Sequence, residues 1–232
     1  AAVRHCDIVI ESAPEDMTFK QALFAELETH VRPDAVLATN TSGLSITEIA
    51  GNCTHRERIL TTHFWNPPHL VPLVEIVRGE NTDPAVAEDV RALLVQCHKT
   101  PVMVKLDKPG QLGNRLQMAL MREALHICES GIAGVEDIDL AIKNGFGMRL
   151  PVYGLFEHID IVGLDIVRNL FDYVSRDLSN QSGATGDLDA RKSSGRTGAN
   201  AGQGYYDWSK KDAHAVKALR DEFLLDIVKR YR

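Results

Sequence analysis

Short apolar runs alternate with amphipathic segments along the N-terminal part of the chain. The apolar runs are rich in β-branched residues and end in polar or small residues, which is typical of buried strands. They cover residues 7–11, 35–39, 58–64, 73–77 and 101–104. Strands and helices that alternate at this short spacing predict a parallel α/β sheet.

The segments between these strands predict helices with recognisable starts. The sequence from Thr18 to Gln21 is a candidate capping box, and Pro33 closes the helix that follows it. Apolar side chains repeat every four residues along one face of this helix, at Phe19, Leu23, Leu27 and Val31. Residues 44–50 predict one or two helical turns. Another helix should begin with Asp83 as N-cap and Pro84 at the first helical position.

The pattern changes after Lys105, where the predicted strands cease. Helical periodicity covers residues 114–129, 135–143, 154–178 and 212–232. Residues 179–204 are rich in Ser, Gly, Asn and Ala and hold almost no large apolar side chain, so we expect an exposed loop there. The sequence therefore predicts an α/β domain over residues 1–106 and an all-α domain over residues 107–232.

Composition narrows the function classes. With 44% hydrophobic and 25% charged residues among 232, the chain has the composition of a folded globular protein. A formal charge of −6 argues against nucleic-acid binding, and no apolar run reaches the ~18 residues of a membrane span. We expect a cytoplasmic protein, with the mitochondrial matrix as the alternative. The four cysteines are Cys6, Cys53, Cys97 and Cys128, and they form no CxxC pair. We therefore expect reduced, buried thiols and no metal site.

Polar residues follow several of the predicted strands. Parallel sheets bind ligands beyond the carboxyl ends of their strands, so Glu15, Ser42, His63 and Asn66 are candidates for a functional site. No GxGxxG turn occurs anywhere in the chain, although a dinucleotide-binding fold should open with one.

His63 and Glu75 form the most suggestive pair. Two prolines after His63 force a sharp turn, and the next strand returns with Glu75 inside an apolar run. A buried carboxylate needs a partner, and a carboxylate on one ring nitrogen makes the other nitrogen a better base. This arrangement suits removal of a proton from an alcohol. The alternative is a core histidine bonded to a carbonyl, with Glu75 facing solvent on an edge strand.

Several ordered motifs resemble the 3-hydroxyacyl-CoA dehydrogenase family. They are NTS at 40–42, HFWNP at 63–67, LVEIV at 73–77, PGQLGNRL at 109–116, EDID at 136–139, GLD at 163–165, GRTG at 195–198 and GQGYY at 202–206. The resemblance implies a partial Rossmann-type parallel sheet plus a helical C-terminal domain that also forms a homodimer. It implies NAD-dependent oxidation of the 3-hydroxyl of an acyl-CoA, in fatty acid metabolism.

The resemblance assigns roles to four residues. His63 would be the general base, and Glu75 would orient and polarise it. Ser42 would hydrogen-bond the substrate oxygen near the nicotinamide, or else be an ordinary turn residue. Asn114 would enter the site from the first helix of the second domain and stabilise a developing oxyanion, or else merely cap that helix.

The resemblance also implies contacts to NAD. The residues that would make them are Glu15, Lys20, Ser42, Asn66 and Arg196. Lys20 alone would as readily be a solvated helix charge, and Arg196 stands where the family commonly has a lysine, in a loop that would leave it solvated. The family's opening strand, glycine-rich turn and ribose-binding acid would lie before Ala1. We therefore expect that the chain lacks ~90 residues of a mononucleotide-binding unit, or pairs with another chain.

The leading hypothesis is an NAD-dependent dehydrogenase of a short-chain 3-hydroxyacyl-CoA. One alternative keeps this chemistry but takes a free hydroxy acid such as carnitine or a sugar acid. Another is a binding or dimerisation module without catalytic activity, because the phosphate-binding turn is missing.

Overall fold

The computed structural model describes residues 2–231 and divides the chain into two compact units, over residues 1–117 and 118–232. Every strand of the sheet lies in the first unit. The division falls inside helix α4 (Gly113–Glu129), whose first turn therefore belongs to the α/β unit.

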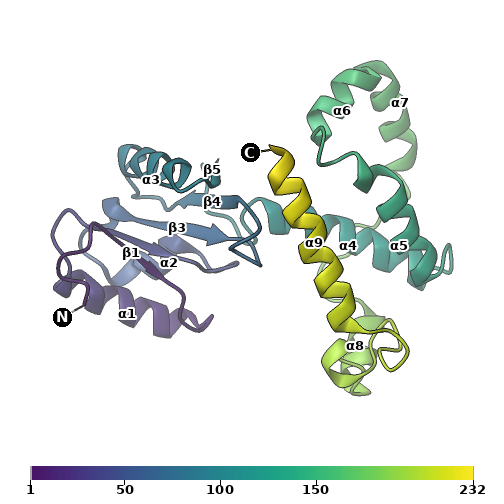
Figure 1. Cartoon of the computed structure of the whole chain (residues 1–232), viewed down its shortest axis with the longest axis horizontal. Coiled ribbons are helices and arrows are strands. Elements are labelled where there is room, and N and C mark those ends of the chain that lie inside the picture. Colours follow the sequence, from purple (N-terminus) through teal and green to yellow (C-terminus); the bar gives the residue numbers. More distant parts are fainter. Residues whose placement is uncertain (1, 232) are drawn as a thin grey trace. The chain divides into compact units, whose positions relative to one another are not determined.

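The first unit is built on a five-stranded sheet in the order β1-β2-β3-β4-β5 (Figure 1). Its strands are β1 (Ile8–Glu11), β2 (Val36–Thr39), β3 (Ile59–Phe64), β4 (Leu73–Arg78) and β5 (Thr100–Val104). Neighbouring strands run parallel as predicted, except that β3 and β4 are antiparallel. The exception arises because the chain reverses between Phe64 and Leu73 through a proline-rich turn, without the crossover helix that a parallel pair needs.

Helices cover both faces of this sheet. Helices α1 (Met17–His30) and α2 (Ile46–Ile49) lie on one face, and α3 (Pro84–Gln96) lies on the other (Figure 1). Alternate residues of a strand serve the two layers, so that Leu37 packs toward α1 while Ala38 packs toward α3. The two buried clusters form the unit's core, one on each face of the sheet.

The buried face of helix α1 includes part of the predicted stripe, since Leu27 and Val31 pack against the core. Its N-cap is Asp16, whose carboxylate accepts the N–H of Phe19, so the capping box at Thr18 is wrong. The buried residues are Lys20 and Phe24, whereas Phe19 is 48% exposed. The prediction is wrong at the start of the helix, where the buried position is taken by Lys20, a charged residue that the apolar pattern left out. The helix ends at His30, before Pro33.

One predicted helix start and one predicted pair of helical turns are confirmed. Asp83 caps α3 by accepting the N–H of Ala85, and Pro84 is its first residue. Residues 46–52 form α2 and a short 3-10 turn, as their pattern predicted.

The second unit is helical, as expected, but two of its segments differ from the prediction. Beyond α4 it contains α5 (Val135–Asn144), α6 (Leu155–Val162), α7 (Leu164–Val174), α8 (Gly186–Ser193) and α9 (Ala213–Tyr231). The single helix expected over residues 154–178 breaks at Gly163, where φ is +100°. The expected loop over residues 179–204 holds α8, which Thr185 caps. Among residues 2–231, no helix is both long and apolar enough to cross a membrane.

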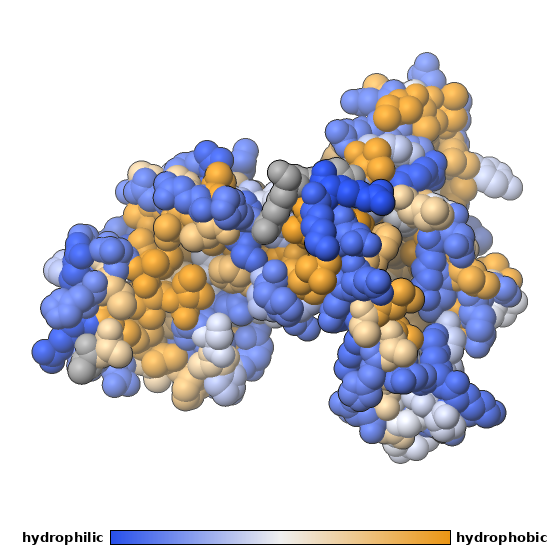
Figure 2. Space-filling model, viewed as in Figure 1, coloured by the Kyte–Doolittle hydropathy of each residue, from blue (hydrophilic) through white to orange (hydrophobic). Residues whose placement is uncertain are grey.

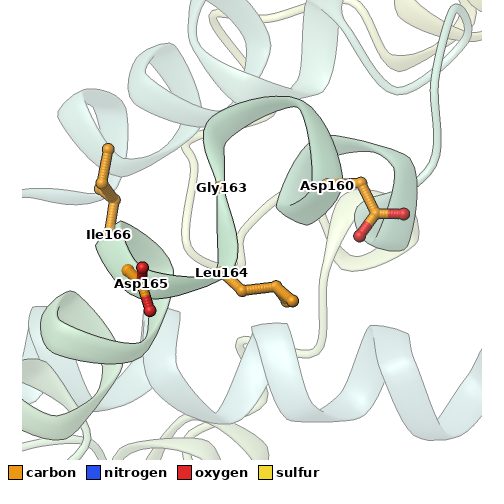
Figure 3. A pocket seen from close by; sticks show the side chains of 5 residues that line it. All are labelled: Asp160, Gly163, Leu164, Asp165 and Ile166. Atoms are coloured by element: carbon orange, nitrogen blue, oxygen red, sulfur yellow. The ribbon is translucent and has the colours of Figure 1, made fainter.

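The break at Gly163 leaves a hollow between α6 and α7. It has a volume of about 620 Å³ and is lined by Asp160, Gly163, Leu164, Asp165 and Ile166. Figure 3 shows the Asp160 and Asp165 side chains on opposite sides of the turn rather than facing one another. None of the predicted site residues lines this hollow.

The four cysteines are free thiols in different environments. Cys53 is buried, and its burial raises the pKa of the thiol to about 11. Cys97 is exposed, and Cys6 and Cys128 are partly exposed. The expectation that all four are buried is therefore wrong.

Candidate active site

Strand pairing brings His63 and Glu75 together. They are direct partners in the antiparallel register of β3 and β4, and Nδ1 of His63 lies 2.7 Å from Oε2 of Glu75. His63 is 6% exposed and Glu75 is fully buried, because β4 lies between β3 and β5. The alternative of a solvent-facing Glu75 on an edge strand is thereby excluded.

Each oxygen of Glu75 accepts two hydrogen bonds. Oε2 accepts from His63 and from the indole N–H of Trp65 at 2.9 Å. Oε1 accepts from the backbone N–H groups of Leu112 at 3.0 Å and Gly113 at 2.8 Å. These four bonds fill the acceptor capacity of the carboxylate, and the last two place it at the N-terminus of α4, where a negative charge is favourable.

These contacts fix the charge of Glu75. Burial alone raises the pKa of a carboxyl, but here the hydrogen bonds from His63, Gly113, Trp65 and Leu112 outweigh it and lower the pKa of Glu75 to about 2. The group is therefore a carboxylate at neutral pH. It holds His63 with the proton on Nδ1, which leaves the Nε2 lone pair available to accept another proton.

A second set of hydrogen bonds fixes the loop after β2. The Glu15 carboxylate accepts from the Thr41 hydroxyl at 2.5 Å and from the Ser42 backbone N–H at 3.0 Å. From the other side, the Asn114 amide donates to the Ser42 carbonyl at 2.9 Å, and the Gln111 amide donates to the Thr41 carbonyl at 3.0 Å. The Ser42 backbone is held on both sides while its side chain remains exposed.

The first turn of α4 joins this loop to the His63–Glu75 pair. Asn114 lies inside the helix, which begins at Gly113, so it is not the N-cap. Its side chain reaches Ser42, while the N–H of the preceding Gly113 reaches Glu75. The structure thus gathers Ser42, His63, Glu75 and Asn114 at one edge of the sheet.

Lys20 lies in the buried interior, not in solvent. Its Nζ is 2.7 and 2.9 Å from the two carboxylate oxygens of Glu11 and 3.2 Å from the carbonyl of Ala13. Lys20 is 1% exposed and Glu11 is 6% exposed, and Glu11 also accepts from the Thr39 hydroxyl at 2.6 Å. The interpretation of Lys20 as a solvated helix charge is wrong.

This buried ion pair predicts a large asymmetry between single and double substitutions. K20M should lower the free energy of unfolding by about 3–5 kcal/mol, because it leaves the Glu11 carboxylate buried without its cation. K20M/E11Q should lose much less. Urea unfolding measures both, with K105M at an exposed lysine of the same unit as the control. Equal losses in the single and double variants would show that the ion pair is not the source.

Two further predicted residues lie apart from this network. Asn66 follows β3 and is exposed. Arg196 lies in the second unit, where its guanidinium donates to the Gly204 carbonyl at 3.0 Å. No group of three or more His, Cys, Asp or Glu side chains among residues 2–231 is arranged to hold a metal ion.

The sequence did not reveal every member of the network. Glu11, Gln111 and the indole N–H of Trp65 were missed. Glu11 had a usable signal, since a carboxylate that ends a buried strand needs a partner and Lys20 follows it on the next helix. Gln111 and Trp65 act through contacts between distant segments, which no local pattern indicates.

Two family models together match most of the chain. The model of the 3-hydroxyacyl-CoA dehydrogenase NAD-binding domain matches residues 1–107, and that of the 3-hydroxyacyl-CoA dehydrogenase C-terminal domain matches residues 110–208. The cofactor expected from the sequence, NAD, is therefore the one that the first matched domain binds.

Curated relatives differ in substrate. A 5-formyl-3-hydroxy-2-methylpyridine 4-carboxylate 5-dehydrogenase of Mesorhizobium japonicum is 31% identical over 97% of this chain and 73% of its own. A crystal structure of an enzyme of that name, an NAD+ dependent dismutase, superimposes with a TM-score of 0.93 and covers 99% of this chain and 74% of its own.

Two other relatives have names that give further substrates. An L-carnitine dehydrogenase of Pseudomonas putida is 39% identical over 70% of this chain, and the match spans only 51% of that enzyme. A probable 3-hydroxybutyryl-CoA dehydrogenase of Bacillus subtilis is 36% identical over 89% of this chain and 71% of its own. The two matched domains and these relatives show that the chain belongs to the 3-hydroxyacyl-CoA dehydrogenase family of NAD-dependent dehydrogenases.

Proposed function

We propose that this chain oxidises the hydroxyl group of a small-molecule substrate, with His63 as the general base. The observation that carries the proposal is the bond from Nδ1 of His63 to a fully buried carboxylate. That bond orients the ring, leaves Nε2 to take the hydroxyl proton, and stabilises the imidazolium that forms. Glu75 is a positioning residue, because it acts through His63.

Ser42 and Asn114 complete the proposed site. The Ser42 hydroxyl is exposed at the sheet edge on a backbone that Glu15 and Asn114 hold, so it can donate to the substrate oxygen. Asn114 orients Ser42 in the structure. Its amide has two N–H donors, so it can also face a developing oxyanion.

The residues at this edge suit a nicotinamide. NAD, when bound, supplies the acceptor for the hydride that leaves the hydroxyl-bearing carbon. Exposed Asn66 and Ser42 offer the donors and acceptors that a carboxamide requires, and half-exposed Glu15 accepts a hydrogen bond from the backbone N–H of Ser42. Lys20 acts on this edge through Glu11 and, at 3.9 Å, through Glu15. Arg196 is a weaker candidate for a cofactor contact, because its guanidinium binds Gly204.

For the substrate, we propose a short-chain 3-hydroxyacyl-CoA, supported by both family models and by the Bacillus relative. A second candidate is a small hydroxy acid without CoA. It is supported by the TM-score of 0.93 against the pyridine carboxylate enzyme and by the carnitine dehydrogenase relatives.

A substrate panel distinguishes these candidates. We expect NADH to form with 3-hydroxybutyryl-CoA. The kcat/KM for free 3-hydroxybutyrate should be at least 10-fold lower, because each ~1.4 kcal/mol of binding energy lost with the CoA contacts lowers it by a factor of ten. Carnitine and pyridine carboxylates complete the panel. Preference for a free acid would favour the second candidate. If no substrate reacts and saturating NAD gives none of the ~2.7 kcal/mol stabilisation expected at 100 times Kd, the chain is a binding or dimerisation module.

We also propose that the helical unit forms a homodimer with a second copy of this chain. Helices α4 to α8 contain no buried residue among those that the structure describes. Large apolar side chains on α6 and α7 are exposed. Figure 2 shows apolar side chains over this part of the surface. Phe156 is 83% exposed, Leu164 68% and Phe171 65%. An apolar surface of this extent needs a partner, and an identical copy supplies equally apolar helices.

Light scattering tests the dimer. The wild type should have twice the 25.7 kDa mass of the chain, and L164D/F171D should shift it toward a single chain by placing charges in the interface. V95D, at an exposed apolar residue of α3, is the matched control and should leave the mass unchanged. A wild-type mass of one chain at micromolar concentration would contradict the proposal.

A further inference from the structure

Trp65 shares the carboxylate oxygen that holds His63. Its indole Nε1 lies 2.9 Å from Oε2 of Glu75, and His63 Nδ1 lies 2.7 Å from the same atom. The two rings are 5.8 Å apart between centroids and inclined by 52°. The two donors therefore compete for the electron density of one oxygen.

Gly113 provides the space for this indole. A Cβ at position 113 would lie 2.3 Å from Cζ2 of Trp65 and 3.1 Å from Cη2, well inside van der Waals contact. The backbone gives no other reason for a glycine, since its φ is not in the left-handed region. The close approach of the ring therefore explains the residue.

We propose that Trp65 is a positioning residue of this active site: by sharing Glu75 Oε2 with His63 it sets the pH at which His63 is available as a base, and Gly113 is the residue that makes this possible. The proposal rests on the proposed function, because it concerns the same base. It assigns to the Trp65–Gly113 pair a task that neither residue has in the mechanism described above.

The direction of the effect follows from hydrogen-bond competition. A carboxylate oxygen that also accepts from an indole attracts an imidazolium less strongly. Within the described part of the chain, the groups that donate to Glu75 are His63, Trp65 and the N–H groups of Leu112 and Gly113; neither Lys nor Arg is among them. Without the indole N–H, protonated His63 is held more tightly, so the free base appears only at higher pH.

The first test is the pH dependence of kcat/KM. W65F should move its acidic limb upward by roughly half to one pH unit, less than the loss of a whole hydrogen bond to a charged group, because the indole acts on His63 only through the shared Oε2 of Glu75. W208F removes the only other tryptophan, which lies in the second unit, and should leave the limb in place. An unmoved limb in W65F, in a protein that H63Q inactivates, would overturn the proposal and leave the proposed function intact.

The second test needs no activity. G113A should lower Tm by roughly 5 °C because its Cβ overlaps the indole, and W65F/G113A should recover most of that loss because Phe lacks the two nearest ring atoms. If the double variant melts no higher than G113A, the pairing of Trp65 with Gly113 is wrong. If W65F/G113A recovers the lost Tm but H63Q is active, the packing of Trp65 against Gly113 is confirmed and the proposed function is wrong.

Discussion

H63Q should lower kcat by about 10²- to 10⁴-fold, the contribution expected from a positioned general base. Glutamine retains a side-chain N–H that can donate to Glu75, so the hydrogen bond to the carboxylate can persist. It has no lone pair of comparable basicity where Nε2 of histidine stands. The variant therefore removes the proton acceptor and keeps the surrounding network.

The control for H63Q is stability. Its free energy of unfolding should fall by no more than about 1 kcal/mol, the typical effect of a single substitution, because glutamine can keep the hydrogen bond to Glu75. The thermal shift on adding NAD should match that of the wild type. Turnover is followed by NADH formation with the best substrate of the panel. Near-normal turnover would eliminate His63 as the base.

E75Q should destabilise the first unit by about 3 kcal/mol at neutral pH. The native carboxylate satisfies four donors, and an amide places its own N–H₂ against two of them, which leaves buried donors unpaired. The fall of the Glu75 pKa from 4.5 to about 2 corresponds to a similar energy, about 3 kcal/mol. Turnover should also fall, because His63 loses the group that orients it.

The pH dependence of stability separates charge from shape. Because folding lowers the pKa of Glu75, the stabilisation is complete above 4.5 and is lost as the pH falls toward about 2. Urea unfolding of wild type and E75Q between pH 7 and 2.5 should therefore show a difference that shrinks through this window. A difference that is the same at every pH would mean that the carboxylate charge contributes nothing.

The central pair could be predicted because local rules determine it. The prolines after His63 force the chain to reverse, and a reversal between two short strands makes their residues partners. The burial of Glu75 followed from the apolar residues on either side of it. A local rule also predicted the start of α3 correctly, with Asp83 as N-cap and Pro84 as the first residue.

Other features could not be predicted because they depend on contacts between distant segments. The buried face of α1 includes Lys20, which is stable there only because Glu11 on β1 neutralises it. The break at Gly163 requires a positive φ that the apolar pattern of residues 154–178 does not indicate. The need for Gly113 arises from Trp65, a residue on another element.

Deuterium transfer in a single turnover tests the account most directly. The substrate, deuterated at its hydroxyl-bearing carbon, is mixed with enzyme and NAD, and the mass of the reduced cofactor is measured over time for wild type and H63Q. We predict that the reduced cofactor of the wild type carries the deuterium and that H63Q forms it at least 100-fold more slowly. Deuterium released to water, or equal rates in the two proteins, would contradict oxidation of a hydroxyl group with His63 as the base.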